Sequence, residues 1–178
     1  MNQDQLKQKP IYFSDYFKVD KTKLSELGIF DPILNFDTKL FVDPILLKSS
    51  SNEIIRNSRN KYMDFFKGLL LLLQNSQEIN DKCWRTAKKM VYFPEYKYTC
   101  IGYGSDSING SGSGTDLNDK IFQSAKEIAQ IAKNDPDIFL LLPLLEAGIG
   151  SDRISDMTQN IIDDAICDYT VEMIKKLS

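Results

Sequence analysis

The sequence predicts a mostly α-helical domain of the α+β class, with a small β-hairpin or short sheet. Three observations lead to this prediction. Long stretches repeat apolar residues at helical spacing, polar segments with glycine or proline separate them, and only two short stretches are rich in β-branched and aromatic residues. The chain has 178 residues, 42% of them hydrophobic, which is enough for one compact core. We therefore expect a flexible N-terminus over residues 1–10 and a single compact domain over residues 11–178.

The first expected elements are short. Residues 20–27 have the composition of a helix that Gly28 ends. Residues 39–42 are the best strand candidate, since polar turns bound them. Residues 92–103 combine aromatic and β-branched side chains, which predicts one strand or a hairpin.

The longest expected helix covers residues 50–75. Ser50 and Glu53 have the spacing of a capping box, in which each side chain bonds a free N–H of the first turn. We expect further helices over residues 79–91, 116–133, 136–147 and 152–177, the last of which should pack across the longest one. The apolar positions that give the longest helix its buried face are Ile54, Ile55, Tyr62, Phe65, Phe66, Leu69, Leu70 and Leu73.

Charge is spread unevenly along the chain. The net charge is -3, but residues 1–97 carry 16 basic and 12 acidic side chains, whereas residues 135–178 carry 3 and 9. The two ends therefore present opposite fields, or attract one another where they pack. The overall balance does not indicate a generally basic nucleic-acid-binding protein.

Three features bear on the compartment. The polar start lacks a signal-peptide core, and the apolar runs 69–73 and 138–145 are shorter than the roughly 20 residues that span a bilayer. Cys83, Cys100 and Cys167 are scattered, with no C-x-x-C pair, which fits reduced thiols. We expect a cytoplasmic protein with no membrane partner.

Histidine is absent from the chain. This excludes Ser-His-Asp and Cys-His nucleophile activation and histidine-based zinc sites. Any catalysis must use carboxylates, lysine, hydroxyl groups or a metal held by oxygen ligands, for which Mg²⁺ is suited.

The segment 148–156 is the densest group of special residues. Its glycines permit a tight turn, and Ser151 can cap a helix that begins there. Asp152 and Asp156 then lie one turn apart on a face that Asn160 and Asp163 continue. Like charges at this spacing disfavour a helix unless a cation or basic partner balances them. A Mg²⁺ or phosphate-handling site is one interpretation, and a capped, solvated acidic face is the other.

Two more acidic positions complete a candidate nuclease set. Asp43 follows the expected strand 39–42, although its Asp-Pro pair also suits simple helix capping. Glu95 and Lys97 match the E-x-K half of metal-dependent PD-(D/E)xK nucleases and would share one face of a strand. E-x-K is a common tripeptide, so this interpretation is weakly specific.

Two other segments could bind ligands. Gly110, Gly112 and Gly114 lie in a Gly/Ser loop before a helix, where a phosphate could bind, although the loop is not a Walker motif and could equally be a plain surface loop. Basic side chains could contact nucleic-acid phosphates, or could form an ordinary solvated face. The candidates for phosphate contact are Lys82, Arg85, Lys89 and Arg153.

Residues 34–44, LNFDTKLFVDP, and residues 148–157, GIGSDRISDM, together resemble the N-terminal region of a little-characterised bacterial family associated with phage-defence and mobile loci. The resemblance covers most of the chain and implies that Asp43, Asp152 and Asp156 matter, without implying an activity. Since the family's members look longer, it also implies a domain or a truncated form.

These observations leave three functional hypotheses open. The first is Mg²⁺-dependent nucleic-acid processing, with Asp43, Asp152 and Asp156 holding metal, Glu95 sharing it, and Lys97 or Arg153 stabilising phosphate charge. The second is a non-catalytic interaction or sensor module of a defence system, docking through the acidic last helix or through self-association. The third is nucleotide binding by the Gly/Ser loop.

Overall fold

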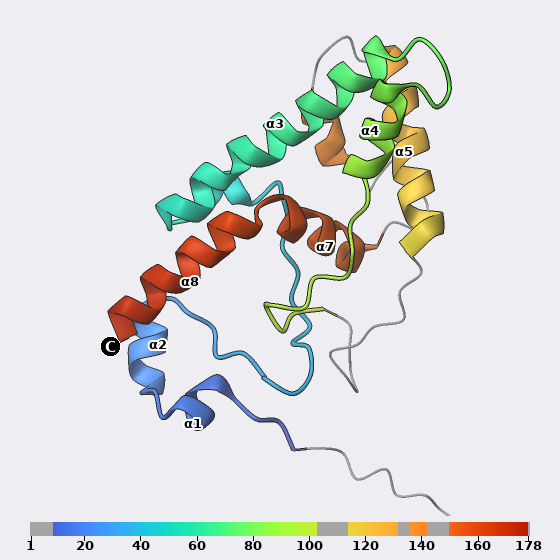
Figure 1. The fold of residues 1–178 in the computed structure, drawn as a ribbon. Helices are drawn as coiled ribbons and strands as arrows, with labels where there is room; N and C mark the ends of the chain where they lie inside the picture. The colour runs from blue at the N-terminus through green and yellow to red at the C-terminus, as the bar shows by residue number, and fades with distance from the viewer. Residues whose placement is uncertain (1–8, 103–113, 132–135, 142–149, 178) are drawn as a thin grey trace, which may run out of the picture. The chain divides into compact units, whose positions relative to one another are not determined.

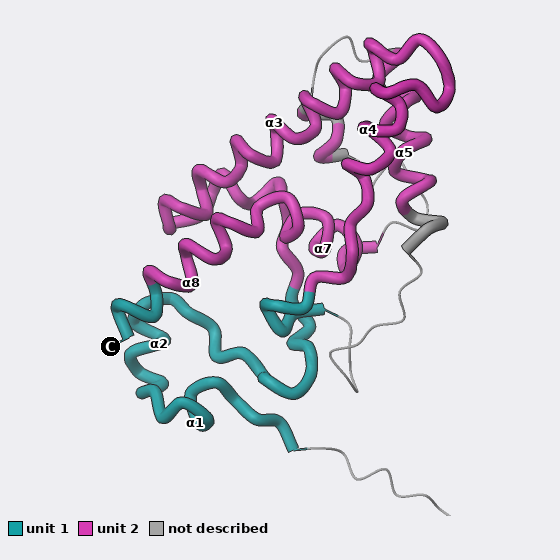
Figure 2. The backbone as a smooth tube through the Cα atoms, in the orientation of Figure 1, with its two compact units in different colours: residues 1–40, 97–110, 173–178 teal, residues 41–96, 111–172 magenta. Residues whose placement is uncertain are grey.

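A computed structural model describes residues 9–102, 114–131, 136–141 and 150–177. Within these ranges the chain is mostly helical, as the sequence predicts (Figure 1). It groups into two compact units, each built from separated stretches of sequence (Figure 2). Unit 1 comprises residues 1–40, 97–110 and 173–178, and unit 2 comprises residues 41–96 and 111–172. No described helix has the length and apolar character needed to cross a membrane.

Unit 1 contains two short helices, α1 (Phe13–Phe17) and α2 (Lys21–Glu26). The Asp20 side chain accepts the N–H of Thr22, and Gly28 has a φ of 68° just beyond the helix. The predicted helix over residues 20–27 is confirmed, because these two residues supply its cap and its stop.

Unit 2 is organised around α3 (Glu53–Asn75). Tyr62, Phe66, Leu69 and Leu70 recur at helical spacing and are buried. The Phe66 ring stacks on Phe139, with 4.3 Å between centroids. The elements that contact α3 are η1 (Leu47–Ser49), α4 (Lys82–Met90), α5 (Gly114–Ile131), η2 (Pro136–Leu141) and α7 (Ser151–Ile161).

The start of α3 differs from the prediction. The helix begins at Glu53, so Glu53 is its first residue and cannot reach back as a capping-box partner. Asn52 is the cap instead and accepts the N–H of Ile55 at 3.2 Å. The Ser50 hydroxyl lies two residues before this cap and accepts the N–H of Asn52.

Other helix boundaries also move. The helix predicted over residues 79–91 begins at Lys82, since Asp81 caps it by accepting the N–H of Trp84 at 2.7 Å. The helix predicted over 116–133 is α5 and begins at Gly114. The helix predicted over 136–147 is a 3-10 helix over Pro136–Leu141, and its remainder lies outside the described residues.

The predicted terminal helix is two helices. α7 ends at Ile161 and α8 runs over Asp163–Leu177. The break falls at Ile162, whose ψ of 20° departs from helical values while its side chain is 1% exposed. Burial of Ile162 thus accompanies a change of helix direction that apolar spacing alone does not reveal.

The predicted β element is not observed in the described ranges, which contain only two isolated bridges, Tyr12 with Ile33 and Thr38 with Ile101. Residues 39–42 form no strand, since Lys39 lies in a bend and the Val42 N–H donates to the Ser155 hydroxyl at 2.9 Å. The described part of segment 92–103 also bonds helical side chains. Because these backbone groups already have partners, no ladder between strands is needed.

Phe66→Ala should lower the free energy of unfolding by about 3–5 kcal/mol, because it empties the centre of the unit 2 core. Urea denaturation measures the change. Leu71→Ala, on the exposed side of the same helix (48% exposed), is the matched control and should cost far less. Equal losses in the two variants would contradict the central place of α3.

Candidate functional site

The polar side of α7 joins it to two extended segments of unit 2. On one edge the Ser155 hydroxyl accepts the N–H of Val42 and also accepts the Gln159 side-chain amide at 3.0 Å. Ser155 is 1% exposed and Gln159 is fully buried. These two buried polar residues are therefore satisfied by each other and by the backbone.

Residues 94–96 lie beside α7 and contact its Asp156 and Asn160 side chains (Figure 1). Asp156 Oδ1 accepts the Tyr96 N–H at 3.3 Å, and Asn160 Nδ2 donates to the Pro94 carbonyl at 2.8 Å. The Tyr96 hydroxyl donates to Asp163 at the start of α8. The polar line that the sequence places on one helix face, Asp156, Asn160 and Asp163, therefore clamps a second segment of chain.

This clamp gives Asp156 an unusual environment. Burial raises its pKa from 3.8 to about 6, against the opposing effect of the Tyr96 N–H. The charges of Asp152 and Glu95 raise it further, and Arg153 lowers it. Asp152 and Glu95 are thus both close enough to Asp156 for their charges to act on it.

A carboxyl group with a pKa of about 6 can accept or donate a proton near neutral pH. Perturbed groups of this kind are concentrated in functional sites, although structural ion networks produce them too. Among the described residues no three Asp, Glu, Cys or His side chains form a metal-binding group. Mg²⁺ commonly uses only one or two carboxylates together with water and phosphate. Magnesium binding here stays a prediction.

Asp43 has a different environment. Its Oδ1 accepts the Ile45 N–H at 2.8 Å, which is the local capping that its Asp-Pro pair predicts. Its charge acts on Tyr62 of α3, whose pKa is raised mainly by burial. The groups whose charges act on Asp156 do not include Asp43, so the structure gives no support for a ligand set that joins these two residues.

The structure changes the prediction for several other residues. Lys97 belongs to unit 1, and residues 95–97 do not form a strand, so the same-face argument for E-x-K is wrong. Gly110 and Gly112 lie outside the described residues, whereas Gly114 is the first residue of α5. Ser151 is the first residue of α7 and not its cap, since Gly150 takes that position.

The basic residues divide between two helices. Arg153 lies on α7 and offsets the charge of Asp156. Lys82, Arg85 and Lys89 are exposed on α4, where their spacing of three and four residues places them on one face. Within the described ranges none of these three forms an ion pair with a carboxylate, whereas Lys88 pairs with Asp119 at 3.0 Å.

Four residues that contact the site or continue the basic face of α4 in sequence were not identified from the sequence. Ser155 and Gln159 looked like ordinary helix residues, although their spacing of four on an otherwise apolar side was a usable signal. Tyr96 lies in the segment predicted as a strand, and its hydrogen bonds to Asp156 and Asp163 were not expected. Tyr92 continues the stripe of Lys82, Arg85 and Lys89 in the sequence, and this continuation could have been noticed.

Asp156→Asn should change how stability depends on pH. The folded protein holds the Asp156 proton more tightly than the unfolded chain between pH 3.8 and about 6, so the contribution of Asp156 to stability falls as pH rises through this window. Asparagine keeps an acceptor for Tyr96 and removes the charge. The full shift corresponds to about 3 kcal/mol, and solvent around this half-buried group reduces the expected difference to about 1 kcal/mol.

Urea titrations from about pH 4 to about pH 7 in metal-free buffer measure this difference. Relative to wild type, Asp156→Asn should gain stability as pH rises. The exposed α8 residue Asp168 supplies the control variant Asp168→Asn, which should show no such gain. A constant gap between wild type and Asp156→Asn would contradict the raised pKa.

Comparison with known proteins places the chain in a family without assigning an activity. Neither a curated protein nor a solved structure matches it. A family model described as Domain of unknown function (DUF8370) matches residues 18–178, which include both extended segments, α4 and the α7 carboxylates. The chain belongs to the DUF8370 family.

Proposed function

We propose that this domain binds nucleic acid through the basic face of α4, defined as Lys82, Arg85 and Lys89. The observation that carries the proposal is that these three exposed cations share one helix face and none forms an ion pair within the described ranges. Phosphate groups supply the negative charge that this face lacks, and binding to them releases counterions.

The surroundings of α4 favour an external anion. The helix itself, KCWRTAKKM, contains four cations and no acidic residue. The nearby Asp81 carboxylate accepts the N–H groups of Gln77, Glu78 and Trp84 and the Ser76 hydroxyl, so its oxygens are already occupied. Arg85 donates one N–H to the Asn80 carbonyl at 2.6 Å, which fixes its guanidinium without neutralising it.

Replacing Lys82, Arg85 and Lys89 together with glutamine should abolish most binding to nucleic acid. Three phosphate contacts to a single strand give a salt dependence with a slope of about −2, so wild-type affinity should fall about 20-fold between about 50 and about 200 mM salt. Fluorescence anisotropy with a labelled oligonucleotide measures both quantities.

The matched control replaces three exposed lysines of unit 1, Lys18, Lys39 and Lys175, with glutamine. It removes the same charge and should retain binding and slope. Equal loss in both triple variants would show that only net charge matters, and would contradict the proposed surface.

A second candidate is phosphodiester hydrolysis at the α7 carboxylates. The specific observation in its favour is that the charges of Asp152 and Glu95 both act on Asp156, whose pKa is raised to about 6. Two of these carboxylates would hold Mg²⁺, whose remaining positions water and phosphate would fill. Arg153 would stabilise phosphate charge beside them.

Magnesium should raise the melting temperature of the wild type if this second candidate is correct. At about ten times Kd, binding stabilises the folded state by about 1.4 kcal/mol, or roughly 3–5 °C for a chain of this size. Asp156→Asn should lose the shift and Asp168→Asn should keep it. The same shift in all three proteins, or none in the wild type, would contradict the magnesium site.

The association with bacterial defence and the role of an interaction or sensor module both stay predictions. Nucleotide binding by the Gly/Ser loop also stays a prediction, since most of that loop lies outside the described residues.

A further inference from the structure

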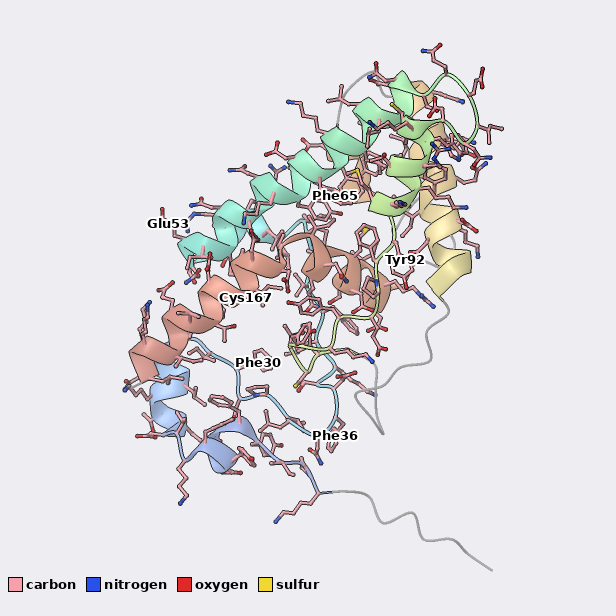
Figure 3. All side chains as sticks on the ribbon, viewed as in Figure 1. Phe30, Phe36, Glu53, Phe65, Tyr92 and Cys167 are labelled. Carbon is pink, nitrogen blue, oxygen red and sulfur yellow. The ribbon has the colours of Figure 1, made fainter. Side chains whose placement is uncertain are left out.

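Tyr92 lies directly beyond the C-terminal end of α4, three residues after the last cation of its basic face. The three cations lie on one helix face by their spacing of three and four residues, whereas α4 ends at Met90 and Tyr92 comes two residues later. Tyr92 comes directly after the C-cap Val91 and is labelled in Figure 3. Its N–H donates to the Lys89 carbonyl at 3.3 Å, so a hydrogen-bonded turn links Tyr92 to the last turn of α4. An aromatic ring therefore follows the three cations.

Tyr92 is exposed, whereas its two neighbours in the sequence pack into or against the core. Tyr92 is 63% exposed, while Val91 before it is fully buried in the core and Phe93 after it packs against Phe65, with 5.6 Å between ring centroids. The chain is thus anchored on both sides of Tyr92. An anchored, solvent-facing ring loses little conformational freedom when a flat ligand stacks on it.

The combination of cations and an exposed ring selects one kind of nucleic acid. In a duplex the bases are stacked on one another, and phosphate contacts alone would use only the lysines and arginine. Single strands leave base faces open, and proteins bind them with a basic track for the backbone and aromatic rings for the bases. From Lys82 to Lys89 the helical rise is about 10 Å, and Tyr92 follows three residues later, which suits a few nucleotides of extended strand.

We propose that the α4 face binds single-stranded nucleic acid, with phosphates on Lys82, Arg85 and Lys89 and a base stacked on Tyr92. This inference rests on the proposed function and specifies its substrate class. DNA and RNA share the chemistry that it uses, namely a phosphate backbone and unstacked bases. An acidic protein would pair with the three cations but would offer no base to stack on the Tyr92 ring.

The experiment uses fluorescence anisotropy on the full chain with four probes. These are thymidine and uridine oligonucleotides of about 12 nucleotides, a hairpin duplex carrying the same number of phosphates, and polyglutamate. The wild type should bind one or both single strands more tightly than the duplex and polyglutamate. The ratio between the two single strands shows whether DNA or RNA is preferred, and either preference supports the proposal.

Variants at position 92 isolate the stacking contribution. Tyr92→Ala should weaken single-strand binding about 10-fold or more and leave duplex binding unchanged, since stacking on one ring contributes that much. Tyr92→Phe should retain single-strand binding because it keeps the ring. Tyr16→Ala is the matched control, since Tyr16 is a similarly exposed tyrosine of α1 in unit 1.

The outcomes separate this inference from the proposed function. Equal binding of single strand and duplex, with no effect of Tyr92→Ala, would overturn the single-strand assignment while leaving nucleic-acid binding intact. No binding to any oligonucleotide, or tighter binding to polyglutamate, would overturn both. Thermal unfolding of each variant verifies that lost binding does not reflect lost folding.

Discussion

Three polar side chains of α7 provide hydrogen bonds that a β-sheet would otherwise supply, and much of unit 2 depends on this arrangement. Ser155, Asp156 and Asn160 bond backbone groups of two extended segments. Partly buried backbone N–H and C=O groups must find partners, because leaving one unpaired costs about 1–3 kcal/mol. With side-chain partners in place, the segments around Val42 and Pro94 stay extended without pairing as strands.

The same arrangement accounts for the chemistry of Asp156. To reach the Tyr96 N–H, its carboxylate lies half-buried against residues 94–96, and that burial is the largest cause of its raised pKa. The clamp also brings Glu95 close enough to act on it. The structural role of Asp156 thus raises its pKa. Any function of Asp156 would use an environment that the fold already requires. Asp152 and Arg153, one turn away on the same helix, set the balance of charge around it.

Several of the helices could be predicted from the sequence because local features set them. Asp20, Asp81 and Gly28 stand at helix ends, and apolar spacing gives α3 its buried face. The two predicted strands are not observed for a non-local reason, since their partners are side chains 60 and 113 residues away in the sequence. The Ile162 break and the proximity of Glu95 to Asp156 likewise arise only from packing. Among the candidate residues, the basic residues Lys82, Arg85 and Lys89 are exposed, as predicted. The Asp43 carboxylate instead accepts a backbone N–H of its own turn.

Hydrogen exchange at single amides tests most directly whether α7 side chains replace a sheet. The Tyr96 and Val42 amides should both be protected in the wild type. Asp156→Ala should remove protection at Tyr96 and leave it at Val42, and Ser155→Ala should do the reverse. Rapid wild-type exchange at both amides, or unchanged protection in both variants, would contradict the account.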